Sequence, residues 1–138
     1  MGIGSEWTAA RRQARLLGAA GLVLLPWIAV LLLALRDSAG WAALDLAEAG
    51  CLLGTAVLLS AGHRLHRPLA GCAALLLVSD ALWDLGTANT ASGLLVALAM
   101  AVLAELPLAA LCAALALRGP GRMPRRRVAG AAVLALAA

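Results

Sequence analysis

The chain has 138 residues, of which 64% are apolar and only 13% are charged, and its mean hydropathy is +0.96. Soluble domains are close to half apolar and a quarter charged, so this composition excludes an ordinary soluble protein and predicts an integral membrane protein. The formal net charge is +4, but the arginines stand in short clusters beside apolar runs. That placement argues against a nucleic-acid partner, which would need a basic soluble face.

Four apolar stretches are long enough to cross ~30 Å of hydrocarbon as helices, which takes ~20 residues at ~1.5 Å each. We predict spans at 16–35, 41–61, 68–89 and 93–117. The connections between them are short, and short connections make successive helices pack antiparallel. The predicted fold is therefore an all-α membrane protein, a four-helix bundle that runs up, down, up and down.

Arginines flank the predicted spans mainly on one side of the bundle. They precede the first span, separate the second from the third and follow the fourth, whereas Arg36 lies on the other side. The positive-inside rule then places both termini in the cytoplasm of a multi-pass protein of the cell membrane. We expect three parts: a basic cytoplasmic flank at 1–15, a transmembrane domain at 16–117, and a basic flank with a short apolar tail at 118–138.

Five carboxylates interrupt the predicted second, third and fourth spans, and no arginine or histidine shares those spans to neutralise them. A carboxylate near the bilayer centre costs about 2.5–3.5 kcal/mol on insertion scales, so chance is a poor explanation for five. With the predicted topology, all of them fall in the outer half or the middle of the membrane. They are Asp45, Glu48, Asp80, Asp84 and Glu105.

Helical periodicity places the acids of the second and third spans on shared faces. Asp45 and Glu48 are three residues apart, and Asp80 and Asp84 are four apart, with Thr87 continuing their face. Residues at these spacings lie on one side of a helix. Each pair of acids therefore points in one direction from its own helix.

Glu105 in the fourth span shares its face with Ala101, Ala109 and Cys112, and such small side chains let a neighbouring helix come close. Pro107, two residues later, should disturb the helical hydrogen bonds around Glu105. We predict that the five acids meet at one polar site inside the bundle, open to the outside of the cell. Like charges this close cannot all stay ionised, so the site should hold protons or a cation.

Two further features of the spans indicate a function less specifically than the acids do. Gly50 and Gly54 form a GxxxG pair, a spacing that lets two helices approach closely and can form a dimer face. Trp83 stands next to Asp84 and has the chemistry to stack on a bound cation, while a packing or lipid-facing role is the competing interpretation.

The common sequence motifs of enzymes and of cofactor-binding proteins are not found in this chain. The sequence has no GxSxG, Walker A or HExxH pattern. Met100 is the one candidate haem ligand inside the spans, so no cofactor is expected. A membrane enzyme acting on lipid or isoprenoid substrates stays open as a third function, although basic groups for phosphate are missing at the depth of the acids.

The segment "DALWD" at 80–84 and the segment "ELPLA" at 105–109 together resemble a group of uncharacterised small multi-pass membrane proteins of high-GC Gram-positive bacteria. The resemblance covers roughly 45–118 and implies the four-span topology and the importance of Asp80, Asp84 and Glu105. It implies no activity. Related sequences often carry two adjacent aromatic residues between the two aspartates, whereas this chain has Leu82 before Trp83.

Two functions follow from these features. The first is a small transporter or channel-like protein, oligomeric because four short helices enclose little volume, in which the acids bind protons or a cation. The second is an accessory or structural subunit whose buried acids hold helices together or pair with an arginine of a partner membrane protein. The expected partners are the lipid bilayer and either further copies of the chain or another membrane protein.

Overall fold

The structure, a computed structural model, describes residues 3–34 and 39–118, and these residues form helices joined by short loops. The fourth apolar stretch is one continuous helical rod made of α4, a π-helical turn called η1, and α5. The elements in chain order are α1 (Ile3–Ala34), α2 (Ala39–Ser60), α3 (His66–Thr87), α4 (Ala91–Met100), η1 (Ala101–Glu105) and α5 (Leu106–Leu117).

Four helical segments are long and apolar enough to span a membrane, which confirms the predicted four-span fold. They are Thr8–Val30, Gly40–Ser60, His66–Thr87 and Ala91–Leu117. Large apolar side chains such as Leu33, which is 89% exposed, cover the outside of these helices. A surface of this kind is suited to lipid, since soluble monomers rarely expose large apolar patches. The chain is therefore a multi-pass membrane protein.

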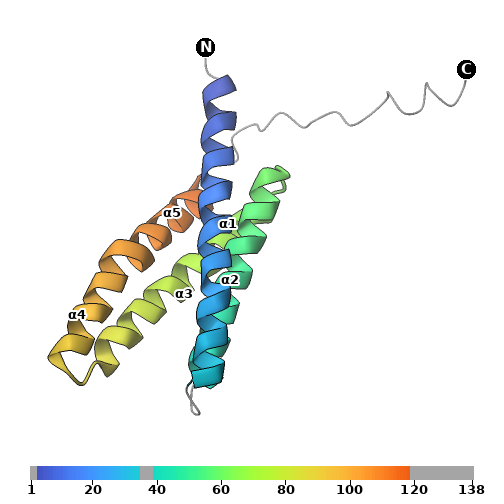
Figure 1. Cartoon of the computed structure of the whole chain (residues 1–138). Coiled ribbons are helices and arrows are strands. Elements are labelled where there is room, and N and C mark those ends of the chain that lie inside the picture. The colour runs from blue at the N-terminus through green and yellow to red at the C-terminus, as the bar shows by residue number, and fades with distance from the viewer. Residues whose placement is uncertain (1–2, 35–38, 119–138) are drawn as a thin grey trace, which may run out of the picture.

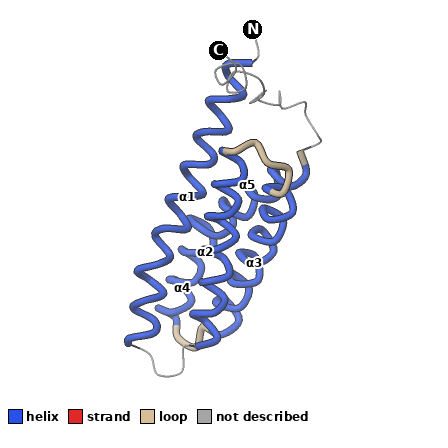
Figure 2. The backbone as a smooth tube through the Cα atoms, turned by 90° about the vertical axis from the view of Figure 1, so that its right-hand side faces the viewer, coloured by secondary structure: helices blue, strands red, loops and turns tan. Residues whose placement is uncertain are grey.

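The first span begins earlier along the chain than the hydropathy pattern predicted. Helix α1 starts at Ile3, so most of the predicted basic flank at 1–15 is helical. Figures 1 and 2 both show the N-terminal part of α1 extending beyond the loop that joins α2 to α3. Of the predicted basic flank and apolar tail at 118–138, residues 119–138 lie outside the described residues.

Each helix packs mainly against its neighbours in the sequence: α1 on α2, α2 on α3, and α3 on α5, with α4 and η1 also against α3. The two helical hairpins, α1–α2 and α3–α4–α5, come together at the end that carries the 61–65 loop and diverge toward the other end (Figure 1). We call these the α2–α3 end and the α3–α4 end, after the helices that the loops join. The α3–α4 end carries the 88–90 loop, and the carboxylates lie in the half of the bundle nearer to it.

Small side chains and leucines close the bundle toward the α2–α3 end. A single apolar core there draws on four helices, with Leu17 of α1, Leu52 of α2, Ala73 of α3 and Cys112 of α5 each fully buried. Helices α1 and α2 approach each other closely at Gly21. A β-carbon added to Gly21 would lie 2.8 Å from Leu53 Cγ, so this contact depends on glycine.

Arginine side chains form hydrogen bonds between helices at the α2–α3 end. Arg67, at the start of α3, donates from Nε and Nη2 to the carbonyl oxygen of Ala116 at distances of 3.3 and 3.2 Å. Ala116 is in the last turn of α5, where carbonyl oxygens have no partner within the helix and a positive charge is favourable. Arg118 donates to Gln13 Oε1 of α1 at 3.3 Å. Arginines at this end thus connect α3 to α5 and the residue after α5 to α1.

Candidate functional site

The five carboxylates predicted to meet do converge between α2, α3 and η1. They form two groups of three that share Asp80. In each group the three side chains offer oxygen atoms that all lie within 4.8 Å of one another. The first group is Asp45, Glu48 and Asp80, and the second is Asp80, Asp84 and Glu105. We call the five residues together the acidic cluster.

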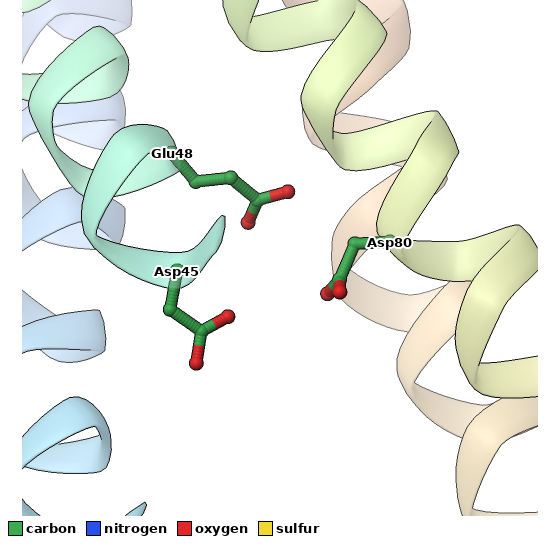
Figure 3. A group of neighbouring side chains, drawn as sticks. All are labelled: Asp45, Glu48 and Asp80. Carbon is green, nitrogen blue, oxygen red and sulfur yellow. The ribbon is translucent and has the colours of Figure 1, made fainter. Parts of the chain in front are cut away.

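The first group joins two helices. Asp45 and Glu48 extend from one side of α2 and Asp80 extends from α3 toward them, so the three carboxylates share the space between the helices (Figure 3). The i,i+3 spacing on α2 accounts for the common direction of Asp45 and Glu48. Residues 32 positions apart in the chain, Glu48 and Asp80, are brought together by the antiparallel packing of α2 and α3.

The acidic cluster is buried inside the protein. Glu48 is only 2% exposed, Asp80 8%, Glu105 6% and Asp45 6%, whereas Asp84 is partly exposed. Three carboxylate oxygens, Glu48 Oε1, Asp80 Oδ1 and Glu105 Oε2, are buried without a hydrogen-bond partner. A buried acceptor without a partner is strongly unfavourable, and a charged one more so. These oxygens therefore need a proton or a cation.

Basic side chains are remote from the acidic cluster in the part of the chain that the structure describes. The nearest arginine along α3 is Arg67, thirteen residues before Asp80 and thus ~20 Å away along the helix axis. Arg67 is bound to the last turn of α5. Within residues 3–34 and 39–118 the arginines gather at the α2–α3 end, away from the acidic cluster, so the cluster is not one half of an internal ion-pair network in this part of the chain.

Glu105 reaches the cluster from a π-helical turn. The amide of Leu106 donates to the carbonyl oxygen of Ala101, five residues earlier, instead of four. Pro107 explains the wider turn, because proline has no N–H and its ring clashes with the carbonyl four residues before it. The predicted disturbance of the helix beside Glu105 is thus present. Single π turns of this kind are frequent at functional sites.

The π turn also keeps one face of the fourth span directed inward. Ala97, Ala101, Glu105 and Ala109 are all buried although they are spaced four residues apart. On a regular α-helix each such step drifts ~40° around the axis, so a run of three steps would rotate the face away from α3. The extra residue in the π turn absorbs this drift. Glu105 consequently shares the buried face that the sequence predicted.

Two tryptophans meet on the α3–α4 side of the acids. The rings of Trp41 on α2 and Trp83 on α3 are in an edge-to-face contact, with centroids 6.2 Å apart and an interplanar angle of 82°. This geometry is favourable for aromatic pairs and links the two helices beside the acidic cluster. Trp83 still exposes 60% of its surface. Its packing role is therefore visible, while its role as a cation ligand stays a prediction.

An open hollow leads to Asp84 from the α3–α4 end. It has a volume of about 460 Å³ and is lined by hydroxyl groups from both sides of the 88–90 loop, including those of Thr87, Thr90 and Ser92. Thr87 donates to the carbonyl of Trp83 at 2.9 Å, and Thr90 caps α4 by accepting from the amide of Gly93 at 3.0 Å. Of the acidic cluster, Asp84 borders this hollow.

The predicted glycine pair divides between two environments. A β-carbon on Gly54 would collide with Leu69 of α3, so Gly54 serves a contact within the chain. Gly50 is exposed and has open space around it. A dimer face at Gly50 remains a prediction.

Sequence patterns missed two features of this region. The contact between Trp41 and Trp83 depends on the rotation of two helices about their axes, which no local spacing determines. Gly21 has no glycine four residues before or after it in α1, so it is not part of a GxxxG pair. Its closeness to Leu53 is apparent only once α1 and α2 are packed. The position of Trp41 four residues before Asp45, on the same helical face, was the one available signal for the tryptophan pair.

No protein-family model matches this chain, and neither a curated protein nor a solved structure was found to be similar to it. The resemblance of the "DALWD" and "ELPLA" segments to uncharacterised small multi-pass membrane proteins of high-GC Gram-positive bacteria therefore stays a prediction. The helices themselves establish the broader class: a small four-span membrane protein with buried clusters of acids.

Proposed function

We propose that this protein is a small transporter or channel-like protein of the cell membrane, and that its acidic cluster binds the proton or cation that it moves. The observation behind the proposal is the set of buried carboxylate oxygens without partners on three helical elements, Glu48 Oε1, Asp80 Oδ1 and Glu105 Oε2. Ionisable groups inside a membrane are commonly part of a proton or ion pathway. Carboxylates placed only to join helices would be expected to hydrogen-bond.

The distribution of arginines supports an orientation with the α2–α3 end in the cytoplasm. Arg64 and Arg67 lie at that end together with Arg118 and the arginines of the N-terminal half of α1, and the positive-inside rule favours the cytoplasmic side for them. In this orientation both termini are cytoplasmic. The hollow beside Asp84 then opens toward the outside of the cell, and the closed apolar core lies on the cytoplasmic side of the acids.

A continuous path across the membrane would require more than one chain. The apolar core fills the α2–α3 end, whereas the hollow beside Asp84 opens at the α3–α4 end. Among the described helices, α4 packs mainly against α3. An oligomer that places Gly50 or α4 at a subunit contact would provide the remaining wall of a path.

Flux measurements in liposomes test the proposal directly. Purified protein is reconstituted into vesicles, a K⁺ diffusion potential is applied, and entry of protons or of cations is followed with fluorescent indicators. We expect flux above that of empty vesicles for the wild type. The double variant Asp80→Asn/Glu105→Gln should fall to the level of empty vesicles, since it removes the carboxylate shared by both groups and the one from η1.

Glu6→Gln is the matched control, because it removes a carboxylate that precedes the first span, Thr8–Val30. It should keep wild-type flux. Equal flux in the double variant, or wild-type flux no higher than that of empty vesicles, would contradict a transport role. In the latter case, co-purification of a stoichiometric membrane partner in mild detergent would favour the accessory-subunit function, in which an arginine of the partner pairs with the buried acids.

A further inference from the structure

We infer that the acidic cluster is a two-ion site for hard divalent cations, in which Asp80 is the ligand common to both ions. The inference deepens the proposed function by naming the class of cation and the number of ions, and it rests on that function for its physiological meaning. Its physical basis is the pairing of two carboxylate groups around one aspartate.

The geometry of each group fits a single ion. Oxygen atoms from three side chains lie within 4.8 Å of one another in both groups. Two oxygens on opposite sides of a cation are separated by roughly twice the metal–oxygen distance, which is about 4.0–4.2 Å for Mg²⁺ and about 4.6–5.2 Å for Ca²⁺. An ion placed within either group can therefore reach three carboxylates with modest side-chain movement, and water can complete its coordination.

Asp80 has two carboxylate oxygens and belongs to both groups, one that includes Glu48 of α2 and one that includes Glu105 of η1. A carboxylate that binds two metal ions through its two oxygens holds them a few ångströms apart, as in two-metal sites with separations of about 3.5–4 Å. The arrangement of the acidic cluster thus contains the bridging ligand that a pair of ions requires.

Unpartnered oxygens supply an independent indication of a ligand. Asp80 Oδ1 and Glu48 Oε1 are buried without hydrogen-bond partners in the first group, and Glu105 Oε2 is in the same condition in the second. All three side chains are more than nine-tenths buried and belong to the groups that face a common space. Each group therefore contains acceptor atoms that a bound cation would satisfy.

Charge balance favours divalent over monovalent ions. The five carboxylates carry up to five negative charges within a largely buried region, and two divalent ions neutralise four of them. Two monovalent ions would leave three charges in mutual repulsion. The donors in both groups are carboxylates without histidine or cysteine, and oxygen-only sites suit Mg²⁺, Ca²⁺ and Mn²⁺ instead of Zn²⁺ or Cu²⁺.

Mn²⁺ is the probe for the test, because the free ion gives a six-line electron paramagnetic resonance signal that is lost on binding. The full chain in detergent micelles is titrated at neutral pH, and bound ions are counted per chain. The wild type should bind two ions, Glu48→Gln and Glu105→Gln one each, and Asp80→Asn none. At full occupancy the wild-type spectrum should also show coupling between neighbouring Mn²⁺ ions.

Glu6→Gln, which removes a carboxylate outside the spans, should bind two ions like the wild type. The inference is overturned if the wild type binds fewer than two ions, if Asp80→Asn keeps either of them, or if Glu48→Gln and Glu105→Gln each lose both. Circular dichroism and elution volume establish that each variant is folded. Should Asp80→Asn fail to fold, the two single-ion variants decide the outcome, since a two-ion site predicts one ion in each.

The result is separable from the outcome of the liposome experiment. Proton flux in vesicles together with an absence of Mn²⁺ binding would overturn the two-ion site and leave the transport function standing. Binding of two ions without flux of protons or cations would leave the two-ion site standing and contradict transport.

Discussion

Glu48 of α2 and Asp80 of α3 face each other across the space between the two helices, and each has a buried carboxylate oxygen without a hydrogen-bond partner (Figure 3). Two ionised carboxylates in such a position repel each other in a medium that screens charge poorly. This unfavourable pair is stable only with a proton or a cation between the helices. The stability of the protein should therefore respond to ions and to removal of either acid.

Divalent cations should stabilise the wild type and should have no such effect on Asp80→Asn. A ligand that binds only the folded state contributes about 2.7 kcal/mol per site at a hundred times its dissociation constant. In the absence of divalent ions, Asp80→Asn should be more stable than the wild type, because it removes a like charge from both groups. Thermal unfolding in detergent, with and without Mn²⁺, measures both effects. A wild type that gains no stability from any divalent ion would contradict the interpretation.

Binding of Mn²⁺ should weaken as the pH falls. Carboxylates bind metal in their deprotonated form, so protons and metal ions compete for the acidic cluster and metal binding releases protons. The apparent affinity should thus be higher at neutral pH than at mildly acidic pH, by about tenfold for each proton released per unit of pH. Titrations over a series of pH values in weakly buffered solution report both the affinity and the number of protons released. An affinity independent of pH would be inconsistent with carboxylate ligands.

Pro107→Ala should restore regular helical hydrogen bonds and shift Glu105 away from Asp80. With the π turn gone, Ala97, Ala101 and Ala109 cannot all keep their buried positions together with Glu105. Proline disfavours a helix interior by about 3 kcal/mol relative to alanine, so the substitution should not lower stability by itself. We expect the number of bound Mn²⁺ ions to fall from two to one while the thermal midpoint is kept. Retention of both ions would show that the π turn is not needed to position Glu105.

Gly21→Ala should destabilise the α1–α2 hairpin. The added carbon would lie 2.8 Å from Leu53 Cγ and 3.2 Å from the carbonyl oxygen of Ala49. Overpacking of this kind costs about 1–3 kcal/mol and outweighs the roughly 1 kcal/mol by which alanine favours a helix. Gly50→Ala is the control, since nothing lies within 4 Å of the corresponding carbon, and it should be neutral or stabilising. Equal unfolding midpoints for the two variants would disprove the close approach at Gly21.

The sequence predicted the four spans and the inward faces of the acids because both depend on local regularity. Asp45 and Glu48, or Asp80 and Asp84, share a face whenever their segment is helical, and the burial cost of charge forces those faces together. Pro107 indicated a disturbed helical turn because the missing N–H and the ring of proline act on the adjacent residues of the same helix. The earlier start of α1 was not predicted, since Arg11, Arg12 and Arg15 lower the hydropathy of a segment that is nevertheless helical.

Sequence patterns could not predict the features that depend on the orientation of each helix about its axis relative to its neighbours. The contact between Trp41 and Trp83 and the shared position of Asp80 in both acidic groups need the packed arrangement of α2, α3 and η1. Gly54 looked like half of a dimer motif, yet its neighbour is Leu69 of the same chain. A spacing rule gives the face on which a residue lies and leaves its partner undetermined.

The convergence of α2 and α3 through their acids can be tested with engineered cysteines. Glu48→Cys and Asp80→Cys are introduced together after the native Cys51, Cys72 and Cys112 have been replaced by serine or alanine, and thiol labelling is measured with and without Cd²⁺. The control pair is Leu46→Cys with Leu82→Cys, at positions that are 58% and 66% exposed on the outside of the same helices.

If Glu48 and Asp80 share one polar space, a low concentration of Cd²⁺ should slow the labelling of both engineered thiols. A pair of thiolates binds the ion far more tightly than either thiolate alone. The control pair should label at the same rate with and without Cd²⁺. Independent labelling of the thiols at positions 48 and 80, unaffected by Cd²⁺ in a folded protein, would show that the acids of α2 and α3 do not meet and would contradict the account of the site.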